Sequence, residues 1–241
     1  MKRPNYVCLF DIEGTTTSIS FVIDTLFPFA TKHIEAHLRE HFDTLSEIIH
    51  EFREQAILDK KNGLENVVLV PLSGSEQIIK AVVSNAHDQI SADRKLGCLK
   101  TIQGQIWLNG YRDGRLCGHI FDDVLPAFKR LKEQEVQICI YSSGSVQAQK
   151  LIFGYSIVGD LRAYISNYFD TKIGHKINHE SYTKILSELN VEAGQVRFFT
   201  DKLSEAEAAR QAGIEVIMMD RPGNPDQGPH SFEIWTDFTA L

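Results

Sequence analysis

The sequence lacks low-complexity tracts and internal repeats over its 241 residues. Its content of 43% hydrophobic and 24% charged residues is typical of a folded globular protein, with disorder confined to the termini and loop tips. The length exceeds that of a typical single domain. We therefore expect either one large domain or a core that carries a sizeable insertion.

Cysteines are few, and they form no C-x-x-C pair. Of the four, Cys8 and Cys139 lie in apolar runs that we expect to be buried strands, and the others are Cys98 and Cys117. This pattern predicts reduced thiols and a cytoplasmic location, with the nucleus added if the source is eukaryotic. Near the start, the apolar run YVCLF is too short for the core of a signal peptide, and no stretch is long enough to span a bilayer.

The sequence also lacks an excess of basic charge. It has 25 Lys and Arg residues against 32 Asp and Glu residues, which gives a net charge of −7 without a local basic cluster. Nucleic acid and anionic membranes are therefore disfavoured as partners. An anionic small-molecule substrate would need a locally positive site. We also expect a monomeric protein.

Strand and helix patterns alternate in much of the chain. The strand patterns are continuous apolar runs without polar alternation, which are typical of parallel strands that are buried on both faces. Asp122 and Asp123 precede one of the helical patterns and are expected to cap it. The sequence predicts an α/β fold with a Rossmann-like parallel-sheet core. The runs are 6–10, 136–141, 163–165, 196–199 and 215–219, and the helical patterns are 123–134, 146–153, 181–189 and 204–212.

Residues 21–110 behave differently, because their apolar positions recur at helical spacing and no convincing strand is found among them. We interpret this stretch as a mostly helical cap inserted after the first strand. The predicted domains are a catalytic core, 1–18 with 112–241, and a cap, 19–111. A cap in that place would exclude water from reacting groups at the strand ends.

The stretch LFDIEGTTT places two carboxylates, Asp11 and Glu13, where a strand ends at Gly14. Residues two apart on a strand point to the same side, and ligands of open parallel sheets bind at the strand ends. The two acids can therefore act on one ligand. Taken alone, the spacing favours a strand end with solvated acids.

Asp11 suits nucleophilic attack on phosphorus, because a carboxylate with a reference pKa near 3.9 is ionised at neutral pH. Repulsion by the phosphate opposes that attack, at about 4 kcal/mol for two unit charges about 4 Å apart at an effective dielectric of about 20. A divalent cation is therefore required, and phosphate oxygens favour Mg²⁺. Glu13 could protonate the leaving oxygen and later activate water.

A second strand, ICIY, ends in Ser142 and Ser143 and is followed at once by a helix. Hydroxyls and free amides at a helix N-terminus form an anion site, although serine caps are common anywhere. Another loop offers Lys172, His175 and Lys176 before a helix. A lysine is a good point charge for a phosphate, but most lysines are solvated surface residues.

The run VRFFTDKLSEAE delivers Asp201 to the end of a further strand, with Glu205 in the next helical turn. We expect Asp201 to hold the cation against Asp11 and the phosphate. Glu205 is expected to stabilise the helix N-terminus or the loop.

The order of these elements, an acid pair, a serine, a loop lysine and an aspartate, resembles the four-motif set of the haloacid dehalogenase superfamily. Within this superfamily, the sequence of these stretches is most similar to the enolase-phosphatase family of methionine salvage. The stretches that carry this resemblance are DIEGTTTSISFVIDTLFPF, IYSSGSVQAQKLIFGYS, FDTKIGHKINHESYTKI, FFTDKLSEAEAA and RPGNP.

The resemblance implies a haloacid dehalogenase-type core with a helical cap, one Mg²⁺ per subunit and acireductone synthase activity. That activity is enolisation of 2,3-diketo-5-methylthiopentyl-1-phosphate followed by loss of phosphate through an aspartyl-phosphate. By position, Asp11 is the nucleophile and a metal ligand, Glu13 is the acid/base residue assigned with the metal, and Asp201 completes the metal site. Ser142, Ser143 and Lys176 bind substrate.

Several points stay open at this stage. Glu13 reaches the ion either by its side chain or by its main-chain carbonyl, and the enolisation base is either Glu13 or Lys176 as a neutral amine. The alternative functions are a capped phosphatase for another small phosphate ester, a phosphate-binding scaffold without turnover, and haloalkanoate dehalogenation. The last needs no Mg²⁺ and would leave Asp201 without a task.

Overall fold

A computed structural model describes residues 6–241, which form two compact units. The first joins the residues up to Val22 to the segment Cys117–Leu241, and the second is Ile23–Leu116. We describe each unit by itself. The functional division of the chain stays a prediction, with a catalytic core of residues 1–18 and 112–241 and a cap of residues 19–111.

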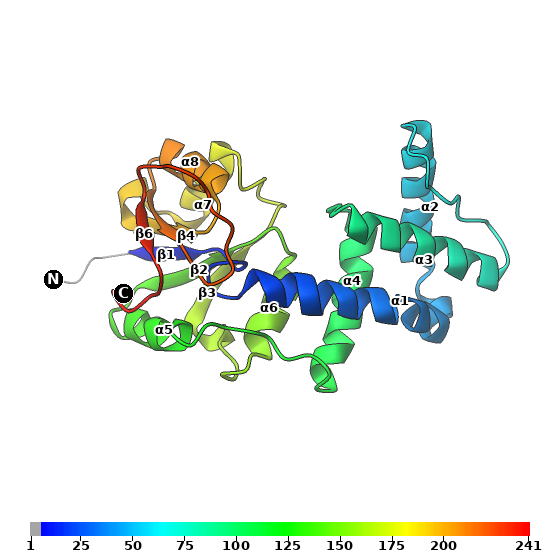
Figure 1. Cartoon of the computed structure of the whole chain (residues 1–241), viewed down its shortest axis with the longest axis horizontal. Coiled ribbons are helices and arrows are strands. Elements are labelled where there is room, and N and C mark those ends of the chain that lie inside the picture. Colours follow the sequence, from blue (N-terminus) through cyan, green and yellow to red (C-terminus); the bar gives the residue numbers. More distant parts are fainter. Residues whose placement is uncertain (1–5) are drawn as a thin grey trace. The chain divides into compact units, whose positions relative to one another are not determined.

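The first unit is built on one six-stranded sheet in the order β3-β2-β1-β4-β5-β6, in which all neighbouring strands are parallel (Figure 1). The central strands are the continuous apolar runs of the sequence, as expected for strands covered on both faces. The strands are β1 (Val7–Phe10), β2 (Gln137–Tyr141), β3 (Ile165–Phe169), β4 (Val196–Thr200), β5 (Glu215–Met219) and β6 (Glu233–Trp235).

Helices cover both faces of this sheet, because successive side chains of a strand point to opposite sides. Phe10 of β1 lies 5.4 Å, between ring centroids, from Phe128 on one face. Its neighbour Leu9 belongs to the core of the other face, together with Tyr182 and Ala206. The helices are α5 (Val124–Glu133), α6 (Val146–Gly154), α7 (His179–Leu189) and α8 (Leu203–Gln211), with 3₁₀ turns at Arg162–Tyr164 and Ala193–Gln195.

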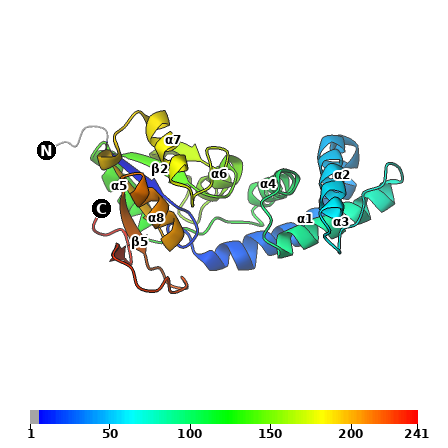
Figure 2. The same cartoon turned by 90° about the horizontal axis from the view of Figure 1, so that it is seen from above.

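The second unit contains helices and no strand among residues 23–116, all of which the structure describes. It has its own buried cluster, with Ile34, Phe52 and Val82 at its centre. Helix α1 packs against α3 and α4, and α2 packs against the same two helices (Figures 1 and 2). The elements are a π-helical turn (Phe21–Leu26) that contains the boundary, α1 (Phe27–His41), a 3₁₀ turn (Phe42–Thr44), α2 (Ser46–Lys61), α3 (Ser75–Ser91) and α4 (Gly97–Arg112).

The predicted α/β fold is confirmed, and the differences lie at the edges of the sheet. The strand predicted at 163–165 is wrong in its bounds, since β3 begins at Ile165 and a 3₁₀ turn occupies the residues before it. Ser166 and Asn167 interrupt its apolar pattern, which an edge strand tolerates. Strand β6, at the other edge, has only three residues and was not predicted.

Candidate active site

The acid loop begins directly after β1. The backbone N–H of Asp11 still donates to Phe199 O, at 2.9 Å, so Asp11 continues the sheet by one hydrogen bond. Gly14 then turns the chain with φ +66°, a conformation that favours glycine. A side chain at this position would also meet Asp201, whose Oδ2 lies 2.6 Å from the place of a Cβ atom. The loop therefore brings the strand-end acid and Asp201 to one place.

Lys176 joins this place from the loop before α7. Its Nζ lies 2.6 Å from Asp11 Oδ1 and 2.5 Å from Glu205 Oε2, and its side chain is 6% exposed. Burial lowers the pKa of Lys176, but Asp11 and Glu205 outweigh that effect and raise it. The ammonium group therefore stays charged, and it lies beside the carboxylate of the strand-end Asp11.

Negative charge is nevertheless in surplus around Asp11. Burial raises the pKa of Asp11 well above its ordinary value against the opposing effect of Lys176, and the carboxylates of Glu205 and Asp201 add to the rise. Burial likewise raises the pKa of Asp201 to about 6. Three carboxylates share little space with one buried ammonium, so a further cation would favour the ionised acids.

Asp201 fits a metal ligand by its unsatisfied oxygens. It is 1% exposed, and neither Oδ1 nor Oδ2 accepts a hydrogen bond from the part of the chain that the structure describes. A buried polar atom without a partner costs about 1–3 kcal/mol, and more if charged. A carboxylate cannot donate, so a cation or its bound water is what these oxygens suit.

The predicted three-acid metal set is not present as a cluster of three side chains. Among residues 6–241 no group of three or more His, Cys, Asp or Glu side chains is arranged to hold a metal ion. Glu13 is only half-buried, whereas Asp11 and Asp201 are buried. Mg²⁺ is commonly held by one or two carboxylates with waters and substrate phosphate, so Asp11 and Asp201 are enough side chains for it.

The predicted serines lie at the end of β2. Ser142 N donates to Phe169 O at 3.1 Å, and the Ser142 hydroxyl accepts from Gly144 N at 3.1 Å. Ser142 is buried and Ser143 is half-buried. Helix α6 then begins after Ser145, whose hydroxyl accepts from Ala148 N at 3.3 Å. The serine turn is thus fixed by local hydrogen bonds at the same edge of the sheet as Asp11.

Glu205 and Lys202 interact with the strand-end groups in ways that the sequence did not predict. Glu205, expected to serve the helix end, instead accepts from Thr200 Oγ1 at 2.9 Å and pairs with Lys176. Burial lowers the pKa of Lys202, but nearby carboxylates, Asp11 first, outweigh it and raise the pKa. The D-x-x-x-E spacing from Asp201 was the available signal, but it does not reveal a partner from a distant loop.

The prediction that the side chain of Asp123 caps a helix is wrong, because it makes no capping hydrogen bond at the start of α5. Asp123 Oδ2 instead accepts from Arg221 Nη2 at 2.8 Å and from Phe238 N at 2.6 Å. Arg221 in turn donates from Nε to Thr15 O at 3.0 Å. The chain that follows β5 is therefore fastened to the acid loop.

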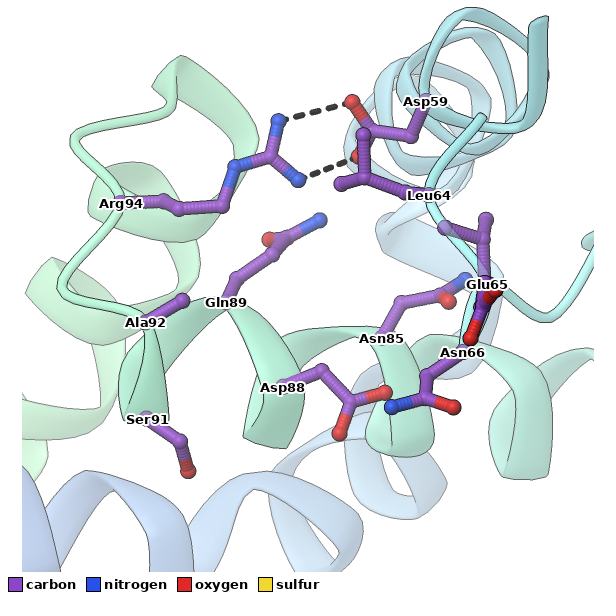
Figure 3. A pocket seen from close by; sticks show the side chains of 11 residues that line it. Asp59, Leu64, Glu65, Asn66, Asn85, Asp88, Gln89, Ser91, Ala92 and Arg94 are labelled. Atoms are coloured by element: carbon purple, nitrogen blue, oxygen red, sulfur yellow. Dashed lines mark hydrogen bonds and ion pairs between the residues drawn. The ribbon is translucent and has the colours of Figure 1, made fainter. Parts of the chain in front are cut away.

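The helical unit has a cavity of about 390 Å³ between α2, α3 and the segment that joins them (Figure 3). Asp59 and Arg94 pair across it, and Asn85 bonds both backbone groups of Val68 at its wall. These contacts brace the helix ends. None of the site residues predicted from the sequence lines this cavity.

Comparison with known proteins shows which family the chain belongs to. A family model described as haloacid dehalogenase-like hydrolase matches residues 7–213. "Enolase-phosphatase E1" of Anopheles gambiae is 50% identical over 228 residues, which are 94% of this chain and 77% of that protein. The chain belongs to the enolase-phosphatase E1 family of haloacid dehalogenase-like hydrolases.

Two further proteins extend the comparison. "Enolase-phosphatase E1" of Aedes aegypti is 46% identical over 96% of this chain, which spans only 21% of that longer protein. The crystal structure of the UTR4 protein of Saccharomyces cerevisiae has a TM-score of 0.78 and 31% identity, and the match covers 98% of this chain and 100% of that one. The family resemblance expected from the motifs is thus confirmed, together with its fold.

Among residues 6–241, no helix combines the length and the apolar character needed to cross a membrane.

Proposed function

We propose that this protein is the bifunctional enolase-phosphatase of methionine salvage, an acireductone synthase. It would enolise 2,3-diketo-5-methylthiopentyl-1-phosphate and then remove the phosphate. Family membership at 50% identity supports the reaction class. The observation within the chain that carries the proposal is the buried contact of Lys176 with Asp11, which sets a fixed positive charge beside a strand-end nucleophile.

In the phosphatase step Asp11 attacks phosphorus. Its Oδ1 is held by Lys176 and by the N–H of Ile12, at 2.6 and 2.7 Å, so we assign the attack to Oδ2. Lys176, with Ser142 and Ser143, binds the phosphate, and the lysine offsets its charge. Glu13 protonates the leaving oxygen and then deprotonates the water that opens the aspartyl-phosphate.

The enolisation step needs a base near the carbon next to the carbonyl. Lys176 lies within 2.6 Å of two carboxylates, Asp11 and Glu205, and such ion pairs hold its amine as ammonium. This argues against a neutral lysine as the base and favours Glu13. Separate Glu13→Gln and Lys176→Met variants, assayed for loss of diketone absorbance apart from phosphate release, test the assignment. Unchanged enolisation in both would exclude both residues.

One Mg²⁺ per subunit belongs to this proposal. When bound, it offsets the repulsion between phosphate and Asp11 and polarises the diketone. Asp11 and Asp201 would hold it by their side chains, and Glu13 by its main-chain carbonyl. The remaining expectations are a small-molecule phosphate as partner, a monomer, and a cytoplasmic location with the nucleus added in a eukaryote. Nucleic acid and membranes are not expected partners.

The test is to incubate the purified protein with the diketone phosphate and Mg²⁺ and to follow enol absorbance and phosphate release together. We expect both signals, no phosphate release with chelator, and a folded Asp11→Asn variant without phosphate release. Asp122→Asn, an exposed acid outside the site, is the matched control. Phosphate release that survives Asp11→Asn would refute the assignment, and preference for another ester in a substrate panel would favour a general capped phosphatase.

A further inference from the structure

The loop after β5 brings an asparagine to the acid loop in a fixed orientation. Asn224 Nδ2 donates to Gly14 O at 2.8 Å and to Met219 O at 3.0 Å. Both partners are carbonyl oxygens, which only accept, so the amide cannot be turned over. Asn224 Oδ1 must therefore face the other way.

This oxygen is buried and accepts no hydrogen bond from residues 6–241. It faces the same space as the unsatisfied carboxylate of Asp201. A Cβ atom placed on Gly14 would lie 2.6 Å from Asp201 Oδ2 and 2.8 Å from Asn224 Oδ1. Glycine at this position thus keeps open a small space lined by oxygens of two different segments.

The three described atoms that come nearest a Cβ atom on Gly14 include no hydrogen-bond donor. Asp201 Oδ1, Asp201 Oδ2 and Asn224 Oδ1 are all acceptors, and none has a partner in the described chain. Buried acceptors of native proteins are normally satisfied, so a group that is a cation or a donor belongs there. A hydrated cation is both, since the metal contacts the carboxylate and its water donates outward.

The segment that carries Asn224 is held firmly. Arg221 is 4% exposed and donates to Thr15 O and Thr236 O, each at 3.0 Å. The carbonyls of Gly14 and Thr15 are therefore both bound by this one segment. A side chain that is fixed in one orientation by its own hydrogen bonds and by a firmly held backbone can orient a ligand at low entropic cost.

We propose that Asn224 is a positioning residue of the cation site: its Nδ2 holds the Gly14 backbone, and its Oδ1 accepts a hydrogen bond from a water molecule bound to Mg²⁺. The inference rests on the Mg²⁺ site of the proposed function. It adds a role for the late RPGNP segment. Partners of this kind, which orient the ligands of a metal, typically change its affinity 10–100-fold when they are removed.

The test separates the two ends of the amide by measuring Mg²⁺ affinity calorimetrically and the melting temperature without metal. Asn224→Asp keeps an oxygen acceptor and loses the two donated hydrogen bonds. Asn224→Leu, whose side chain has a similar size, loses the acceptor and the donated hydrogen bonds. We expect both variants to melt at lower temperature without metal. Only Asn224→Leu should bind Mg²⁺ about 10–100-fold more weakly.

Gln227→Leu is the matched control. Gln227 lies in the same segment as Asn224 and accepts from Leu203 N, and it is not among the atoms nearest a Cβ atom on Gly14. It should leave Mg²⁺ affinity unchanged. If Asn224→Leu does not fold, Asn224→Ala replaces it, since alanine also removes both ends of the amide.

Equal changes of Mg²⁺ affinity in the Asp and Leu variants, or no change in either, would overturn the role of Oδ1 and leave Asn224 a structural residue. Those outcomes leave the proposed function intact. Wild-type protein that binds no Mg²⁺, or binds it equally well after Asp201→Asn, would overturn both this inference and the metal assignment on which it rests.

Discussion

Lys176 shows how one side chain can decide the charge of a buried site. It is paired with Asp11 and Glu205, and all three are at least nine-tenths buried. Removing one member of such a set leaves uncompensated charge, which typically costs about 3–5 kcal/mol. Lys176 therefore offsets part of the cost of burying the Asp11 carboxylate, because it lowers a pKa that burial raises.

Lys176→Met should lower the free energy of unfolding by about 3–5 kcal/mol and abolish phosphate release, since Asp11 and Glu205 lose their common partner. Urea denaturation at pH 7 measures the first effect. Lys172→Met, which alters an exposed lysine of the same loop, should stay within about 0.5 kcal/mol of wild type. Equal stability of the two variants would contradict a structural role for the buried ion pairs.

His119 gives a second prediction at this scale, for pH. Its Nδ1 accepts from Ser18 N at 3.1 Å, which requires an unprotonated Nδ1, and burial lowers its pKa below the ordinary value near 6.5. A histidine with a lowered native pKa contributes stability above its unfolded pKa, and this stability is lost as the pH falls through that range. Unfolding free energies from urea titrations should therefore fall between pH 7 and pH 5.

The matched variant is His119→Asn, whose side-chain oxygen can accept from Ser18 N but does not titrate. Its stability should fall less over the same pH range than that of the wild type. A wild-type slope that is unchanged by the substitution would assign the pH dependence to other groups.

At the scale of elements, burial decides what the sequence reveals. Strands β1, β2, β4 and β5 are covered on both faces and have continuous apolar runs, so they were predictable. Strands β3 and β6 lie at the edges, where polar residues such as Ser166 and Glu233 are tolerated, and the runs are broken or absent. Edge strands are therefore not predicted reliably from apolar runs alone.

Some residues of the site have a local sequence signal and others do not. Asp11, Ser142 and Asp201 each follow a buried strand directly, and parallel strands end at one edge of a sheet. The pairing of Lys176 with Glu205, or of Asp123 with Arg221, joins loops far apart in the chain and has no local pattern. Such contacts depend on the final packing of helices, which periodicity does not specify.

For the whole molecule, the two units have separate cores. One buried cluster lies entirely within Ile23–Leu116, and another lies entirely within the sheet-containing unit. Apolar burial stabilises mainly the unit in which it occurs, because the contacts are short-range. Loss of core packing in one unit should therefore lower protection against hydrogen exchange first in that unit.

Phe52→Ala and Ile185→Ala test this expectation as a matched pair, since each removes a fully buried side chain from one cluster. Costs of about 3–5 and about 2–5 kcal/mol are typical of such cavities. Hydrogen exchange read by mass spectrometry should show Phe52→Ala loosening α1 to α4 while the amides of β1 and β4 keep their protection. Ile185→Ala should show the reverse. Equal loss of protection across both units in either variant would mean that the chain unfolds as one cooperative body, in spite of its two cores.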